Sequence, residues 1–134
     1  MSQEKVEVAR RLFAAWNDGR VAGITPFLAS DVEWHDPPFL PDAAIHRGRE
    51  EVIRHLQDFE RTGVIDLTFN VEDVRPAGDE VIVQVEVHGR GVRSGAPSGG
   101  LRGFYVCLWR GGLLARIRLF ADGDEALKAA GLSE

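Results

Sequence analysis

The chain has 134 residues, of which 44% are hydrophobic and 28% charged, and its formal net charge is -5. These values are typical of one globular domain spanning residues 1–134 and exclude a disordered chain. A single cysteine, Cys107, excludes an internal disulfide, and no apolar run reaches the roughly 20 residues of a membrane helix. Because the N-terminus is charged and lacks the apolar segment of a secretory signal, we expect a cytoplasmic protein without a membrane partner.

Helical periodicity dominates the first half of the chain. Apolar residues recur at helical spacing in residues 4–18, and a second, shorter helix is predicted over residues 21–29. Val32, Trp34 and Asp36 then alternate with polar neighbours, which predicts a strand, and a loop follows over residues 37–48. The third helix is predicted over residues 49–61, with an apolar stripe that consists of Val52, Ile53, Leu56 and Phe59.

The second half of the chain has the period of two that is typical of strands. Apolar residues alternate with polar ones from residue 64, again from residue 81, and in residues 104–109 and 113–120. Asp124 is expected to cap a short final helix that ends at Gly131. Helices followed by strands indicate an α+β fold with a curved antiparallel sheet. We expect a cone, with three N-terminal helices on the concave face, a short C-terminal helix and a small-molecule pocket.

The stretch from Val87 to Ala121 contains six arginines and no acidic residue. Such a stretch can mark a nucleic-acid surface. Here the arginines are spread over predicted strands and turns of an acidic chain, so we interpret them as charge balance against the acidic N-terminal half. No nucleic-acid partner is expected.

Several segments resemble one known group of proteins. They are Leu28–Pro37, with the sequence LASDVEWHDP, then His46–Val52, Gly89–Gly95, Arg118–Asp122 and Glu125–Gly131. Together with the element order, they resemble the SnoaL-like polyketide cyclases and ketosteroid isomerases of the nuclear transport factor two-like superfamily. The resemblance covers nearly the whole chain and implies the cone-shaped fold. It leaves the chemistry open, because this fold hosts isomerases, cyclases, dehydratases, epoxide hydrolases and non-catalytic modules.

Asp36 is the best single candidate for a catalytic residue. The resemblance maps it onto the general base of ketosteroid isomerase, which lies in a similar Val-Glu-Asp-Pro stretch. Independently, alternation places its carboxylate on the same side as Val32 and Trp34, at an apolar mouth where burial would make it a better base. The alternative is that Asp36 only accepts backbone hydrogen bonds in its loop. Leu12 stands where ketosteroid isomerase has a tyrosine, and residues 103–105 contain no acid. That exact reaction is therefore not expected.

Tyr105 and two arginines are the candidates for stabilising a substrate oxygen. Tyr105 could donate a hydrogen bond from its phenol, or it could be a packing residue at a subunit interface. Arg116 and Arg118 share one face of the last strand with Phe120, opposite Ile117 and Leu119. Alternation alone places the two aliphatic residues in the core, whereas the resemblance implies that an arginine reaches toward Asp36. The sequence leaves both arrangements open.

The histidines show no spacing of the HxH or HExxH kind, so neither a metal site nor a cofactor is expected. His46 could be a polar pocket residue or an exposed loop residue. His35 is expected on the sheet face opposite Asp36, and His55 and His88 are expected at the surface. Aromatic residues that could line a pocket are Trp16, Trp34, Phe39, Phe59, Trp109 and Phe120.

These observations predict a protein that binds a small, largely apolar, oxygenated molecule. It could be an isomerase or cyclase, or an epoxide-hydrolase-like enzyme, that uses Asp36 as general base. Tyr105, His46 or an arginine such as Arg118 would then stabilise the developing oxyanion. The alternatives are a carrier or sensor without chemistry and a dimerisation domain. A homodimer is expected, because the sheet face with Ile117 and Leu119 would otherwise be exposed.

Overall fold

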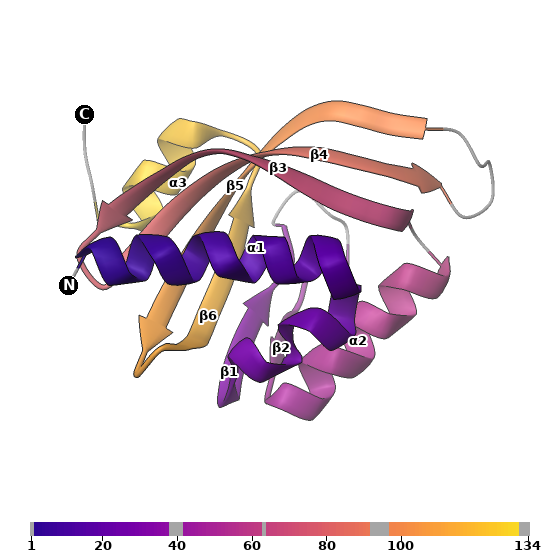
Figure 1. The fold of residues 1–134 in the computed structure, drawn as a ribbon, viewed down its shortest axis with the longest axis horizontal. Coiled ribbons are helices and arrows are strands. Elements are labelled where there is room, and N and C mark those ends of the chain that lie inside the picture. Colours follow the sequence, from indigo (N-terminus) through magenta and orange to yellow (C-terminus); the bar gives the residue numbers. More distant parts are fainter. Residues whose placement is uncertain (1, 38–41, 63, 92–96, 132–134) are drawn as a thin grey trace.

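The computed structural model describes residues 2–37, 42–62, 64–91 and 97–131. One long helix leads into the first two strands of a six-stranded sheet, a second helix precedes the other four strands, and a short helix follows the last strand (Figure 1). The elements are α1 (Ser2–Ile24), the 3-10 turn η1 (Thr25–Phe27), β1 (Leu28–His35), β2 (Ile45–Arg47), α2 (Arg49–Thr62), β3 (Val64–Ala77), β4 (Glu80–Gly91), β5 (Pro97–Arg110), β6 (Leu113–Phe120) and α3 (Gly123–Ala129).

The α+β cone predicted from the sequence is confirmed. The sheet has the order β2-β1-β6-β5-β4-β3 and curls around α1 and α2 without closing, while α3 lies on its other face (Figure 1). The sheet is mixed rather than wholly antiparallel, because β1 and β6 run parallel to each other. Local periodicity could not show this, since the pairing joins two segments from opposite ends of the chain.

Several element boundaries differ from those predicted. The second helical stretch ends at Ile24, after a break at Arg20 (φ 54, ψ -132), so the helix predicted to reach residue 29 is too long. Pro26 follows in η1 and cannot donate a helical hydrogen bond. Residues 45–47 form β2 inside the predicted loop, and β5 begins at residue 97, before the predicted residue 104. The cap of α3 is Asp122, not Asp124, because the Asp122 side chain accepts a hydrogen bond from the Asp124 backbone.

The main core fills the space between α1 and the concave face of the sheet. Phe13, Trp16, Phe69 and Tyr105 pack there, with ring centroids of neighbouring pairs 5.3–6.1 Å apart. Polar contacts fix α1 over this core. The Trp16 indole donates to the Leu67 carbonyl at 2.7 Å. The side chain of Asn17 both donates to and accepts from the Phe69 backbone, at 2.8 and 2.9 Å.

The side chains of β6 that lie on the concave face of the sheet are the aliphatic ones. Ile117 is 2% exposed and belongs to the main core, and Leu119 packs against it. The arrangement that alternation predicts is therefore correct, and the one that the resemblance implied is not. Ile117 is thus covered within one chain, whereas Leu119 is only partly buried, and the expected homodimer stays a prediction.

A smaller cluster lies on the convex face beneath α3. Ile82 and Val106 pack there against Ala126 of the helix, and Phe120 is half-buried beside them.

Candidate functional site

Three side chains from different elements meet where β1 ends. Asp36 directly follows β1, His46 lies in β2 opposite Trp34, and His55 lies on α2. The backbone of Asp36 continues the hairpin, because its N–H donates to the Ala44 carbonyl at 3.0 Å. The Asp36 carboxylate in turn accepts a hydrogen bond from the Ala44 N–H at 3.2 Å. These contacts orient the carboxylate toward the concave side, as the alternation of Val32, Trp34 and Asp36 predicts.

The carboxylate of Asp36 contacts the Nε2 edges of two imidazole rings. Its Oδ2 is 3.1 Å from Nε2 of His46, and its Oδ1 is 3.0 Å from Nε2 of His55. The two rings are stacked, with centroids 3.6 Å apart and an interplanar angle of 17°. The side chains of Asp36, His46 and His55 are 12%, 17% and 26% exposed, respectively. The cluster is therefore largely shielded from solvent but still accessible from one side.

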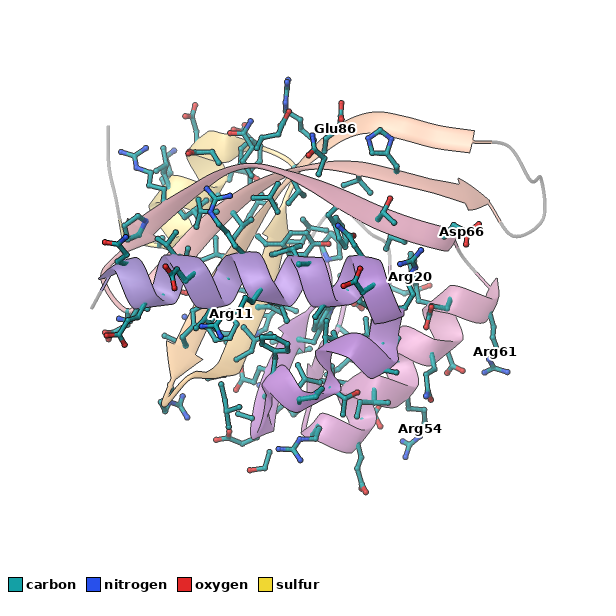
Figure 2. All side chains as sticks on the ribbon, viewed as in Figure 1. Arg11, Arg20, Arg54, Arg61, Asp66 and Glu86 are labelled. Atoms are coloured by element: carbon teal, nitrogen blue, oxygen red, sulfur yellow. The ribbon has the colours of Figure 1, made fainter. Side chains whose placement is uncertain are left out.

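The packing of α2 explains how His55 reaches Asp36. Val52 and Leu56 are buried against the sheet side, and His55 is adjacent to both on the helix surface. Arg54 and Arg61 project from α2 on the side away from the sheet (Figure 2). The sequence prediction that His55 lies at the surface is wrong. A signal was present, because positions 52, 55, 56 and 59 have the i, i+3, i+4, i+7 spacing of one helix face.

The chemistry of the cluster follows from the carboxylate. An ionised carboxylate can only accept hydrogen bonds, so Nε2 of His46, which forms a hydrogen bond with it, must carry the ring proton, and a proton on Nε2 is also what suits the contact of His55 with Asp36. In a neutral histidine the lone pair then resides on Nδ1. Neither Nδ1 of His46 nor that of His55 has a hydrogen-bond partner among the residues that the structure describes. The arrangement thus holds two basic nitrogen atoms in one tautomer.

Tyr105 lies on the same concave face as Asp36. It pairs with Leu119 in the β5–β6 register, one position beyond the Arg118 that pairs with His35. Its ring packs between Phe13 and Phe69, and burial raises the pKa of the phenol well above its ordinary value. These contacts fit a packing residue of the chain's own core, and no described residue forms a hydrogen bond with its hydroxyl.

The two arginines lie on the convex face. Arg116 and Arg118 bind the same Glu80 oxygen at 3.0 and 2.8 Å, and Arg118 also donates to the Ala129 carbonyl at 3.2 Å. The structure therefore does not bring Arg116 or Arg118 together with Asp36. His35 lies on this face as well, at 3.1 Å from Glu33. That hydrogen bond and the nearby Arg47 hold the pKa of Glu33 below its ordinary value.

The aromatic candidates are divided among several environments. Trp16 and Trp109 are buried in the main core, and Trp34 packs against it beside His46. Phe59 is 39% exposed on α2. Phe120 contacts the cluster beneath α3, and Phe39 lies outside the described residues. Among the described candidates, Trp34 is thus placed beside the Asp36 cluster through its pairing with His46, and Phe59 lies one turn after His55 on α2.

Two surface hollows adjoin the described residues. One, of about 520 Å³, lies at the start of α2 and is lined by Ser30, Arg49 and Glu50 among others. The other, of about 210 Å³, lies between α3 and the convex face, next to Phe104 and Leu127. Neither is lined by Asp36, His46 or His55. Among the described residues, no helix combines the length and apolarity that crossing a membrane requires.

Comparisons with solved structures show what this fold resembles. An NTF2-like protein of unknown function from Burkholderia pseudomallei has 18% identity and a TM-score of 0.76, with 93% of this chain and 95% of that one covered. A protein from Catenulispora acidiphila with a ketosteroid isomerase-like fold, in complex with trimethylamine, has 17% identity and a TM-score of 0.73 (94% and 93% covered). A Mycobacterium tuberculosis protein in complex with estradiol-17β-hemisuccinate has 20% identity and a TM-score of 0.71 (87% and 92% covered).

At these identities the likeness establishes the fold alone. No curated protein matches the chain. The sequence model of the SnoaL-like domain, however, matches residues 9–117, which is most of the chain. The protein therefore belongs to the SnoaL-like domain family.

Proposed function

We propose that the protein binds a small, largely apolar, oxygenated molecule and moves a proton on it, as an isomerase or cyclase does. The observation that carries this proposal is the Asp36 carboxylate at the Nε2 edges of the stacked rings of His46 and His55. A carbonyl compound with an acidic α-proton is the substrate class that such a base suits.

In this proposal the proton is taken by a histidine. The Oδ2 of Asp36 already accepts hydrogen bonds from His46 and Ala44, and its Oδ1 is in contact with His55. A free lone pair is instead available at Nδ1 of each imidazole. Asp36 then positions the rings and stabilises the imidazolium that forms when a ring takes the proton. This refines the expectation that Asp36 itself is the general base.

The test is hydrogen–deuterium exchange at the α-carbon of small cyclic ketones and enones in D₂O, followed by NMR. We expect the wild-type protein to accelerate exchange and the Asp36→Asn, His46→Ala and His55→Ala variants to lose about 10²–10⁴-fold of that rate. His35→Ala is the matched control, because His35 also bonds to a carboxylate but on the opposite face. Exchange no faster than in buffer, or equal loss in the control, would refute proton transfer by this cluster.

A second candidate is a non-catalytic ligand-binding or dimerisation domain of the same fold. The dimerisation domain is favoured by the aromatic packing of Phe13, Phe69 and Tyr105, which fills the cone beneath α1. Binding of estradiol-17β-hemisuccinate, measured by tryptophan fluorescence and without any proton exchange, would support a binding module. A dimer by light scattering without ligand binding would support a dimerisation domain.

A further inference from the structure

We propose that Asp36, His46 and His55 form a binding site for a divalent first-row transition metal ion, with Zn²⁺ as its probe. The three side chains each offer one ligand atom, and these atoms all lie within 4.8 Å of one another. Two imidazole nitrogens and one carboxylate oxygen are donors that suit Zn²⁺, Co²⁺ and Fe²⁺, and not Mg²⁺, which prefers oxygen alone.

The distances between the donors are slightly shorter than those of ligands on one tetrahedral ion. With bonds of about 2.0–2.2 Å to the metal, neighbouring ligand atoms in a tetrahedral site are about 3.3–3.6 Å apart. The Asp36 oxygens are 3.1 Å from Nε2 of His46 and 3.0 Å from Nε2 of His55. The ion would take the place of the His46 hydrogen bond and of the His55 contact, and because the two rings are stacked, at least one ring must turn so that both Nε2 lone pairs point to the ion.

The backbone holds the three ligands in place before an ion arrives. Asp36 and His46 lie on neighbouring strands of one hairpin, which the Asp36–Ala44 backbone hydrogen bond closes. His55 is fixed because Val52, one turn before it on α2, is completely buried. Such fixed ligands lose little side-chain entropy on binding. Three metal-binding side chains also leave a coordination position for water or for an oxygen atom of a bound small molecule.

The charge and proton balance favours a dication. With both histidines neutral, the cluster carries the single negative charge of Asp36. On metal binding each ring keeps its proton but moves it from Nε2 to Nδ1, so that Nε2 can bond to the ion. The loaded site then carries one positive charge, and no oxidant or reductant is needed.

This inference is independent of the proposed proton transfer. An ion on Nε2 forces the ring proton onto Nδ1, which removes the lone pair that would take a substrate proton. The metal-loaded protein should thus lose any α-proton exchange that the metal-free protein has. Metal binding is measured directly, so the two proposals can fail separately.

The chain contains two internal controls. His35 lies 3.1 Å from Glu33, and His88 lies 3.0 Å from Glu86. Each pair offers a carboxylate and one imidazole, but no second ring. An ion that binds weakly and non-specifically would bind to these two pairs and to the Asp36 cluster alike. An ion that binds specifically to the cluster would bind unchanged when either of these pairs is removed.

The experiment uses the full chain without an affinity tag, after treatment with a chelator. Zn²⁺ is titrated by calorimetry, Co²⁺ by visible absorption, and Mg²⁺ serves as the negative control. We expect one Zn²⁺ per chain, a Co²⁺ spectrum of low coordination number, and an affinity at least about tenfold weaker in Asp36→Asn, His46→Ala and His55→Ala. His35→Ala and His88→Ala should bind as the wild type does.

NMR of the histidine nitrogens provides a second readout that a structural role would not change. On Zn²⁺ addition the protons of His46 and His55 should move to Nδ1, while those of His35 and His88 stay unchanged. Circular dichroism verifies that each variant is folded. Absence of one-to-one binding to the wild type would overturn the site, and so would unchanged binding in folded Asp36→Asn and His46→Ala.

Discussion

Replacing Asp36 with asparagine tests whether the carboxylate holds the β1–β2 hairpin to α2. The change keeps the shape of the side chain but removes its charge and one acceptor. In the wild type, Asp36 accepts a charge-assisted hydrogen bond from His46 at 3.1 Å, and its other oxygen is 3.0 Å from Nε2 of His55. An asparagine can accept from one ring with its oxygen and donate to the other with its amide, provided that the second ring changes tautomer.

The size of the effect follows from the burial of the cluster. A hydrogen bond to a charged group contributes about 1.5–3 kcal/mol, against about 0.5–1.5 kcal/mol for a neutral one. The rings are partly exposed, and the amide avoids the desolvation cost of the carboxylate, which places the loss at the low end. We expect Asp36→Asn to lower the free energy of unfolding by about 1–2 kcal/mol and Tm by about 3–8 °C.

The assay is urea unfolding followed by tryptophan fluorescence, together with NMR of the histidine nitrogens. Glu33→Gln is the matched control, because it removes the carboxylate from the more exposed His35–Glu33 pair. Such a surface pair should change stability by about 0–1 kcal/mol. The reasoning would be refuted if both variants lost the same stability. It would also be refuted if either His46 or His55 in the metal-free wild type carried its proton on Nδ1.

Three further predictions concern the core. Asn17→Ala should lower the free energy of unfolding, measured in urea, by about 2–3 kcal/mol, because it leaves both backbone groups of Phe69 without their partners. An effect below about 0.5 kcal/mol would mean that the Asn17–Phe69 hydrogen bonds do not anchor α1. Trp16→Phe should cost at least about 1 kcal/mol more than Trp109→Phe, since the Trp16 indole donates to a β3 carbonyl while the buried Trp109 Nε1 has no hydrogen-bond partner among the described residues. Calorimetric Tm values of the two variants provide the comparison, and equal losses would contradict it. Burial raises the pKa of the Cys107 thiol far above its ordinary value, so little thiolate forms at pH 8 and a thiol reagent should label folded protein far more slowly than unfolded protein.

The parts of the fold that the sequence predicted are those with strong local periodicity. The third helix was expected over residues 49–61 and spans Arg49–Thr62, and the last strand was expected over residues 113–120, where β6 lies. The parts that were missed depend on distant partners. β2 has only three residues and exists because β1 offers it an edge. The parallel pairing of β1 with β6 joins segments that no local window contains together.

The candidate site shows the same limit in its chemistry. Alternation placed Asp36 on the correct face, because a strand has only two faces. A search for metal ligands at fixed spacing found nothing, since His46 and His55 come from a short strand and a separate helix. Only the fold brings them to one carboxylate. The resemblance to known enzymes misplaced the arginines for a related reason, because in this chain Glu80 binds Arg116 and Arg118 on the convex face.

The nitrogen that carries the proton in each imidazole ring decides which of the two proposed roles the cluster can have. Transfer of a substrate proton needs a bare Nδ1, which the carboxylate of Asp36 enforces by keeping the proton on Nε2. Metal binding needs a bare Nε2 and moves the same proton to Nδ1. Because His46 and His55 share one carboxylate, an ion that takes one ring from Asp36 also removes the acceptor from the other. The two rings should therefore change tautomer together, so that each molecule of the protein is ready either for proton transfer or for a metal ion.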